Sequence, residues 1–103
     1  MQFTKKQIER YSRQIILKKV GVIGQKKLSK SSVLIIGAGG LGSPIAIYLT
    51  ALGIGKIGII DKDKVEISNL NRQIIFNTND IKKQKSSMAI KKLKKINPEI
   101  KFQ

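Results

Sequence analysis

The sequence contains no cysteine and no histidine. The absence of cysteine excludes a disulfide framework, a thiolate zinc site and a cysteine nucleophile within these 103 residues. The absence of histidine excludes a Ser-His-Asp triad and a histidine metal site. Several large enzyme classes are therefore excluded for this stretch of chain.

Acidic side chains are also scarce, at 6 against 21 basic ones, and the formal net charge is +15. Such a balance favours anionic partners such as phosphates, nucleic acid, acidic proteins or an anionic membrane. All but three of the basic residues are lysine, and isoleucine is equally abundant, as expected from a genome rich in AT codons. We therefore interpret much of the lysine excess as drift on solvated faces. The three arginines, Arg10, Arg13 and Arg72, are more informative.

Residues 31–55 carry no charge and are long enough to span a bilayer. Six glycines and Pro44 break this stretch into short pieces, so a buried strand, a tight turn and a buried helix explain it better. The first residues are polar and show no signal-peptide pattern. We therefore expect no membrane association and a cytoplasmic location, or the plastid stroma if the gene is organellar.

The N-terminal part of the chain is expected to be helical. Thr4 and Gln7 form a capping-box pattern. It predicts a helix to about residue 17, with one face formed by Ile8, Tyr11, Ile15 and Ile16. A second, short helix is expected near 25–30.

The next part of the sequence predicts a βαβ unit. Residues 33–36 are continuously apolar and predict a strand buried on both faces. A helix should follow, capped by Ser43, with Pro44 in its first turn and a glycine at its end. A second strand is expected at 56–60, a helix capped by Asp80 at 81–96, and the start of a third strand at 99–102. The fold class is therefore α/β: the N-terminal portion of a Rossmann-like, doubly wound, mostly parallel sheet, preceded by one or two helices.

A glycine motif lies between the first predicted strand and its helix. Gly37 would allow the tight turn, Gly39 would let the backbone approach a phosphate, and Gly42 would let the helix pack closely. The helix N-terminus would offer N–H groups to an anion. Asp61, at the end of the second predicted strand, is placed to accept hydrogen bonds from ribose hydroxyls; the alternative is a strand-ending aspartate that only caps a turn. These residues fit either a dinucleotide or a mononucleotide such as ATP.

Two further segments are unusual. Five polar side chains crowd the run 68–73, in which Arg72 is a rigid fork suited to phosphate oxygens. The alternative is a solvated loop. The helix 81–96 is rich in lysine, and Lys85 falls within its apolar arc, as Lys92 does. A lysine in this arc is either aimed at a site or extends a snorkelling stem to solvent, and snorkelling explains both positions without a functional role.

Taken together, these motifs resemble the ThiF/MoeB adenylyltransferases, and the molybdopterin-synthase branch is the closest. The resemblance rests on Arg-Tyr-Ser-Arg-Gln at 10–14, the glycine loop, Asp61, Ser-Asn-Leu-Asn-Arg-Gln at 68–73, Lys85 and Ile-Asn-Pro at 96–98. It covers nearly the whole chain. It implies an N-terminal helical segment at 1–31 and, at 32–103, the N-terminal, incomplete part of an ATP-binding Rossmann-like domain.

The resemblance also implies an activity. Members of the family use ATP and Mg²⁺ to adenylate the C-terminal Gly-Gly carboxylate of a ubiquitin-like sulfur-carrier protein, and they release pyrophosphate. The pathway would be molybdopterin or thiamine biosynthesis, and the enzyme a homodimer. The part of the family domain that this sequence does not contain carries a Mg²⁺ ligand, much of the carrier-binding surface and often a zinc site. We therefore expect a nucleotide half-site without zinc, and a poor enzyme alone.

The family pattern assigns roles residue by residue. Arg13, Arg72 and Lys85 are the implied catalytic residues, and Arg13 would reach the phosphates of the partner subunit. No metal ligand is assigned. The implied nucleotide-binding residues are Gly37, Gly39, Gly40, Gly42, Asp61, Ser68, Asn69, Leu70, Asn71, Arg72 and Lys85.

Three alternatives remain. An NAD-binding oxidoreductase domain has no need of Arg72 and its polar neighbours. A nucleic-acid-binding protein would explain the charge, but the five aromatic residues are scattered and no known binding motif occurs, so no specific nucleic-acid partner is expected. A non-catalytic remnant that keeps the fold differs from the adenylyltransferase only by experiment.

Overall fold

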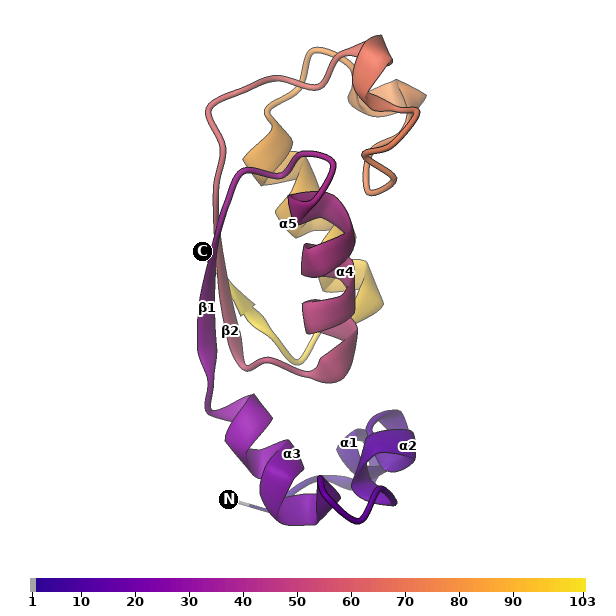
Figure 1. The fold of residues 1–103 in the computed structure, drawn as a ribbon, viewed down its shortest axis with the longest axis vertical. Coiled ribbons are helices and arrows are strands. Elements are labelled where there is room, and N and C mark those ends of the chain that lie inside the picture. Colours follow the sequence, from indigo (N-terminus) through magenta and orange to yellow (C-terminus); the bar gives the residue numbers. More distant parts are fainter. Residues whose placement is uncertain (1) are drawn as a thin grey trace.

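A parallel sheet with helices on one side forms the main body of the computed structural model, which describes residues 2–103 (Figure 1). Strands β1 (Ser32–Ile36), β2 (Lys56–Ile60) and β3 (Lys101–Phe102) pair in the order β1-β2-β3. Helix α4 (Gly42–Leu52) connects the first two strands, and α5 (Lys85–Ile96) precedes the third. Parallel neighbours require such crossover connections. The expected Rossmann-like α/β fold is confirmed.

Three short helices, α1 (Lys5–Arg10), α2 (Ser12–Ile15) and α3 (Gly21–Ser29), precede the sheet. The capping box is confirmed, because the Thr4 hydroxyl accepts the N–H of Gln7 and the Gln7 side chain accepts the N–H of Thr4. The prediction of one helix to residue 17 is wrong, since Tyr11 interrupts it with a non-helical backbone. Tyr11 is buried, whereas Ile8 and Ile16 are exposed, so the expected apolar face is reduced largely to one aromatic ring.

The hydrophobic core lies between the sheet and helices α4 and α5. Ile35, Ile57 and Ile59 point to this side of the sheet and are buried. The prediction that residues 33–36 are buried on both faces is wrong, because Leu34 and Ile36 are 58% and 80% exposed. Successive strand residues point to opposite faces. Both helices lie on the same side of the sheet in Figure 1, so the described residues leave its other face uncovered.

The starts of the two long helices differ from the predictions. Ser43 does not cap α4: it is fully buried, and its hydroxyl accepts the N–H of Ile75 at 3.1 Å. Asp80 does not cap α5, which begins only at Lys85. Instead Asp80 closes a 3₁₀ turn, η2 (Thr78–Asp80), by accepting the N–H of Asn77 at 2.9 Å. Another 3₁₀ turn, η1 (Ile67–Asn69), follows β2.

The ends of these helices agree with the predictions and hold the N-terminal helices in place. Gly53, with φ +94°, ends α4, and α5 ends at Asn97. The last carbonyls of a helix lack intrahelical partners. Gln14 donates to the Leu52 carbonyl of α4 at 2.9 Å, and Arg10 donates to the Ile96 carbonyl of α5 at 3.1 Å. Polar side chains thus dock the N-terminal helices onto the two helix ends.

No helix within residues 2–103 has the length and apolar character needed to cross a membrane.

Candidate functional site

The glycine loop lies at the carboxyl edge of the sheet, directly after β1 (Figure 1). Ligands of open α/β sheets bind at this edge. Gly37 has φ +92°, a left-handed conformation that favours glycine. A Cβ on Gly42 would lie 1.9 Å from the Gly37 carbonyl oxygen, so any side chain there would collide with backbone. The turn and close-packing roles predicted for these two glycines are confirmed.

Asp61 fixes the glycine loop to the end of β2. Its Oδ2 accepts the backbone N–H of Ala38 at 2.7 Å, and its Oδ1 accepts that of Asp63 at 2.8 Å. The sequence predicted a ligand-binding carboxylate at this position, with a turn-capping aspartate as the alternative, and the bond to Asp63 shows that Asp61 does cap its turn. A carboxylate oxygen has more than one lone pair, so both oxygens retain acceptor capacity toward a ligand hydroxyl.

The polar segment 68–73 packs against the glycine loop. The position of a Cβ on Gly40 would be 3.6 Å from Cδ and Nε of Arg72. Nη1 of Arg72 donates to the Ser68 carbonyl at 3.2 Å and to the Asn71 side chain at 3.0 Å. An exposed guanidinium is thus held beside the glycine loop by its own segment.

The other members of this segment have different environments. The side-chain oxygen of Asn69 accepts the N–H of Glu66 at 2.8 Å, which closes η1. Leu70 is half-buried against the hydrophobic core. Ser68 and Asn71 are exposed. Asn69 and Leu70 therefore shape the segment, whereas Ser68 and Asn71 face solvent and steady Arg72.

Lys85 is buried at the start of α5, with 6% of its surface exposed. It lines a polar cavity of about 230 Å³ together with Asp63, Lys64, Glu66 and Asn69. A buried ammonium needs charged or polar partners. The sequence left open whether Lys85 is a snorkelling lysine or a site lysine, and its burial in a polar cavity favours the site. Arg72 does not line this cavity.

Arg13 lies far from the other predicted site residues. It is exposed on α2, at the opposite end of a molecule that is 42 Å long, while the glycine loop lies at the carboxyl edge of the sheet (Figure 1). The structure brings together the glycine loop and Arg72, and separately Asn69 and Lys85, but it does not bring Arg13 to either.

Gln73 is a residue of this region to which the sequence assigned no role. It is 3% exposed, and its Nε2 would be 3.9 Å from a Cβ on Gly39. Its Oε1 is buried with no hydrogen-bond partner among residues 2–103. The available signal was its place at the end of the polar run 68–73.

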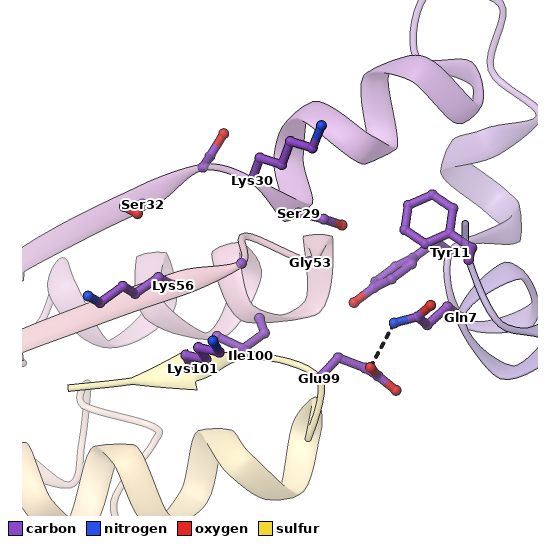
Figure 2. Close-up of a pocket in the computed structure, with 13 residues that line it drawn as sticks. Gln7, Tyr11, Ser29, Lys30, Ser32, Gly53, Lys56, Glu99, Ile100 and Lys101 are labelled. Atoms are coloured by element: carbon purple, nitrogen blue, oxygen red, sulfur yellow. Dashed lines mark hydrogen bonds between the residues drawn. The ribbon is translucent and has the colours of Figure 1, made fainter. Parts of the chain in front are cut away.

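A second cavity, of about 350 Å³, lies between the N-terminal helices and the amino edge of the sheet (Figure 2). Gln7 donates to Glu99 across it at 2.9 Å. Lys30, Lys56 and Lys101 line it. Lys30 and Lys56 point in different directions in Figure 2, so these two do not converge on one anion site. Within residues 2–103, no three potential metal-ligating side chains gather into a cluster.

Comparison with known proteins gives this arrangement a context. A sulfur carrier protein adenylyltransferase of Thermus thermophilus is 46% identical over 98 residues, which are 95% of this chain and 36% of that protein. A probable molybdopterin-synthase adenylyltransferase of Porphyra purpurea is 55% identical over 86% of this chain and 23% of its own length. The crystal structure of Escherichia coli MccB with ATP superposes with a TM-score of 0.84 at 37% identity, over 90% of this chain and 29% of MccB.

The chain spans little more than a third, or less, of the length of these relatives. The first two of these relatives are named adenylyltransferases, and neither is named an oxidoreductase. The family model named ThiF matches residues 11–103, from Tyr11 through the glycine loop to the end of β3. The chain therefore belongs to the ThiF family.

Proposed function

We propose that this chain forms the ATP-binding half of an adenylyltransferase that activates the C-terminal carboxylate of a ubiquitin-like sulfur-carrier protein. The observation that carries the proposal is the packing of Arg72 against Gly40 of the glycine loop. A phosphate at this loop would meet both free backbone N–H groups and a guanidinium. The names of the relatives support a sulfur-carrier protein as the acceptor of the adenylyl group.

Each site residue then has a physical role. The glycine loop, Gly37, Gly39, Gly40 and Gly42, approaches the phosphates through its backbone, and Asp61 accepts the ribose hydroxyls. Arg72, Asn69 and Lys85 contact phosphate oxygens. When a carboxylate attacks the α-phosphorus, negative charge grows on the phosphoryl oxygens and on the departing pyrophosphate. Fixed cations stabilise that charge. The attacking carboxylate is already ionised, so no general base is required.

Magnesium would be held mainly by the nucleotide. Residues 2–103 provide no cluster of three metal-ligating side chains, although Asp63 and Glu66 line the Lys85 cavity. Mg²⁺ commonly retains waters and binds through substrate phosphates and one or two carboxylates. Two carboxylates beside a phosphate site are compatible with that pattern. The ion would supply charge neutralisation of the phosphates.

Arg13 would act in a homodimer. It is exposed and lies at the end of the molecule opposite the glycine loop, so it can meet a phosphate site only on another copy of the chain. Such an arginine supplied across an interface stabilises charge in the transition state.

Titration of the folded chain with Mg-ATP, with NAD as competitor, tests the nucleotide site. ATP binding that Arg72→Ala weakens about tenfold or more, and that NAD does not displace, is the expected result. Lys91→Ala is the matched control, because Lys91 is an exposed cation on α5. Displacement by NAD would favour the oxidoreductase alternative. Carrier adenylation by wild type alone would contradict the expectation of a poor isolated enzyme.

A further inference from the structure

Buried polar atoms without partners are rare in folded proteins, and each one invites an explanation. Two are present within residues 2–103: Oγ1 of Thr50, near the C-terminal end of α4, and Oε1 of Gln73. Thr50 lies in the third turn of its helix, far along α4 from the glycine loop. Gln73 lies next to that loop, with Nε2 3.9 Å from the position of a Cβ on Gly39.

The backbone around Gln73 is well fixed. Its N–H donates to the Asn69 carbonyl at 2.9 Å, and Ile75, two residues on, donates to the Ser43 hydroxyl at 3.1 Å. Ser43 belongs to the first turn of α4, which leaves the glycine loop. The side chain of Gln73 starts from this fixed backbone and lies against the loop, and no group within residues 2–103 satisfies its acceptor. Burying such an acceptor costs stability unless a ligand completes it.

We propose that the carboxamide of Gln73 is a further ligand of the nucleotide, accepting a hydrogen bond that completes Oε1 when the nucleotide binds. This inference rests on the proposed ATP site. The donor must be an O–H or N–H group. Mg-ATP offers few of these, namely the ribose hydroxyls, the adenine amino group and the waters on its metal ion. A phosphate oxygen, which only accepts, cannot complete this atom.

The proposal predicts opposite effects on stability and on affinity. Gln73→Met keeps the unbranched shape and removes the orphaned acceptor, so the nucleotide-free chain should be as stable as wild type or melt up to about 4 °C higher. Its affinity for Mg-ATP should fall about tenfold, because the bound nucleotide loses an acceptor. A merely structural glutamine would show the reverse pattern.

Gln25→Met is the matched control. Gln25 is fully buried, and both polar atoms of its amide have partners: Nε2 donates to the Leu52 carbonyl at 2.9 Å and Oε1 accepts from Gln14 at 2.8 Å. It lies among the N-terminal helices, away from the glycine loop. This variant should melt about 4–8 °C lower for each kcal/mol lost, and its affinity for Mg-ATP should be unchanged.

Thermal melts without nucleotide and calorimetric titrations of wild type and both variants decide the matter. A lower melting temperature of Gln73→Met, or an affinity loss of less than about threefold, overturns the proposal while wild-type binding keeps the ATP site intact. Absence of ATP binding by wild type overturns both the Gln73 proposal and the proposed ATP site.

Titrations with 2′-deoxy-ATP, 3′-deoxy-ATP, inosine triphosphate and metal-free ATP then identify the group that donates to Oε1 of Gln73. If wild type binds all four of these ligands more tightly than Gln73→Met does, by the same factor as for Mg-ATP, Oε1 does not accept a hydrogen bond from the nucleotide and the proposal fails.

Discussion

The carboxylate of Asp61 holds the backbone N–H of Ala38 at 2.7 Å, and so ties the glycine loop to the end of the neighbouring strand. The residue expected to bind a ribose thus also shapes the glycine turn after β1. Both tasks require the same ionised group, because a carboxylate can accept several hydrogen bonds at once.

Replacement of Asp61 should therefore affect the chain even without ligand. Asp61→Ala removes two hydrogen bonds from an ionised acceptor, and we expect the free energy of unfolding to fall by about 1.5–3 kcal/mol. Asp61→Asn keeps one acceptor and should lose less. Urea denaturation measures both, and Asp63→Ala, which removes an exposed carboxylate, is the control. Equal stability of Asp61→Ala and wild type would refute the anchoring role.

Two glycines of the loop should respond differently to alanine. At Gly42 the new Cβ would lie 1.9 Å from the Gly37 carbonyl oxygen, so Gly42→Ala should lower stability by about 1–3 kcal/mol or more. At Gly39 the nearest heavy atom would be 3.9 Å away, so Gly39→Ala should fold normally. Its methyl group would instead occupy space that a phosphate needs, and ATP affinity should fall. A stable Gly42→Ala variant in denaturant titration would contradict the close packing.

The ion pair between the buried Asp80 and the half-buried Lys92 makes stability depend on pH. Their atoms are 3.1 Å apart. Burial by itself raises the pKa of Asp80, but the Asn77 N–H and the nearby Lys92 and Lys83 outweigh it and hold that pKa below its ordinary value. A depressed carboxyl pKa stabilises the fold above its unfolded value of about 3.8, and this stability disappears as pH falls through the lower folded value.

The expected result is a steeper loss of stability in wild type than in Asp80→Asn as pH falls below about 4. Denaturation curves at several pH values measure the difference. Parallel curves for the two proteins would show that Asp80 does not carry this dependence.

The docking of the N-terminal helices depends partly on one phenol. The Asn97 side chain donates to the Tyr11 hydroxyl and to the Thr50 carbonyl, each at 3.0 Å. Tyr11→Phe removes the first of these and should lower stability by about 0.5–1.5 kcal/mol. Tyr48→Phe, at a side chain that is 71% exposed, should change nothing measurable in the same denaturation assay. Equal losses for both variants would remove any special role of the buried hydroxyl.

Local patterns predicted much of this structure. The strand, glycine turn and helix around Gly37 and Gly42 were predicted, because a left-handed turn and a close backbone contact each require glycine. The Thr4 capping box was also predicted, because its two partners are only three residues apart in the sequence. The helix ends at Gly53 and Asn97 also depend on local backbone preferences.

The errors occurred where distant segments compete for the same group. Ser43 and Asp80 were predicted to be helix caps. The Ser43 hydroxyl instead accepts the N–H of Ile75, 32 residues away. Asp80 accepts the N–H of Asn77 and forms an ion pair with Lys92 on α5. The prediction that Leu34 is buried was wrong because a strand pattern cannot tell which face of the sheet the helices cover. The sequence also could not show that Oε1 of Gln73 lacks a partner, because this depends on how distant segments pack around it.

The sequence by itself determined the family and the α/β fold and predicted the residue types of a nucleotide site, because all three inferences depend on motifs of fixed spacing. Only the tertiary structure decided that Arg72 packs on Gly40, that Lys85 is buried in a polar cavity and that Arg13 lies at the far end of the molecule. These relationships join residues separated by tens of positions. They are fixed by how the helices pack on the sheet, which no local pattern encodes.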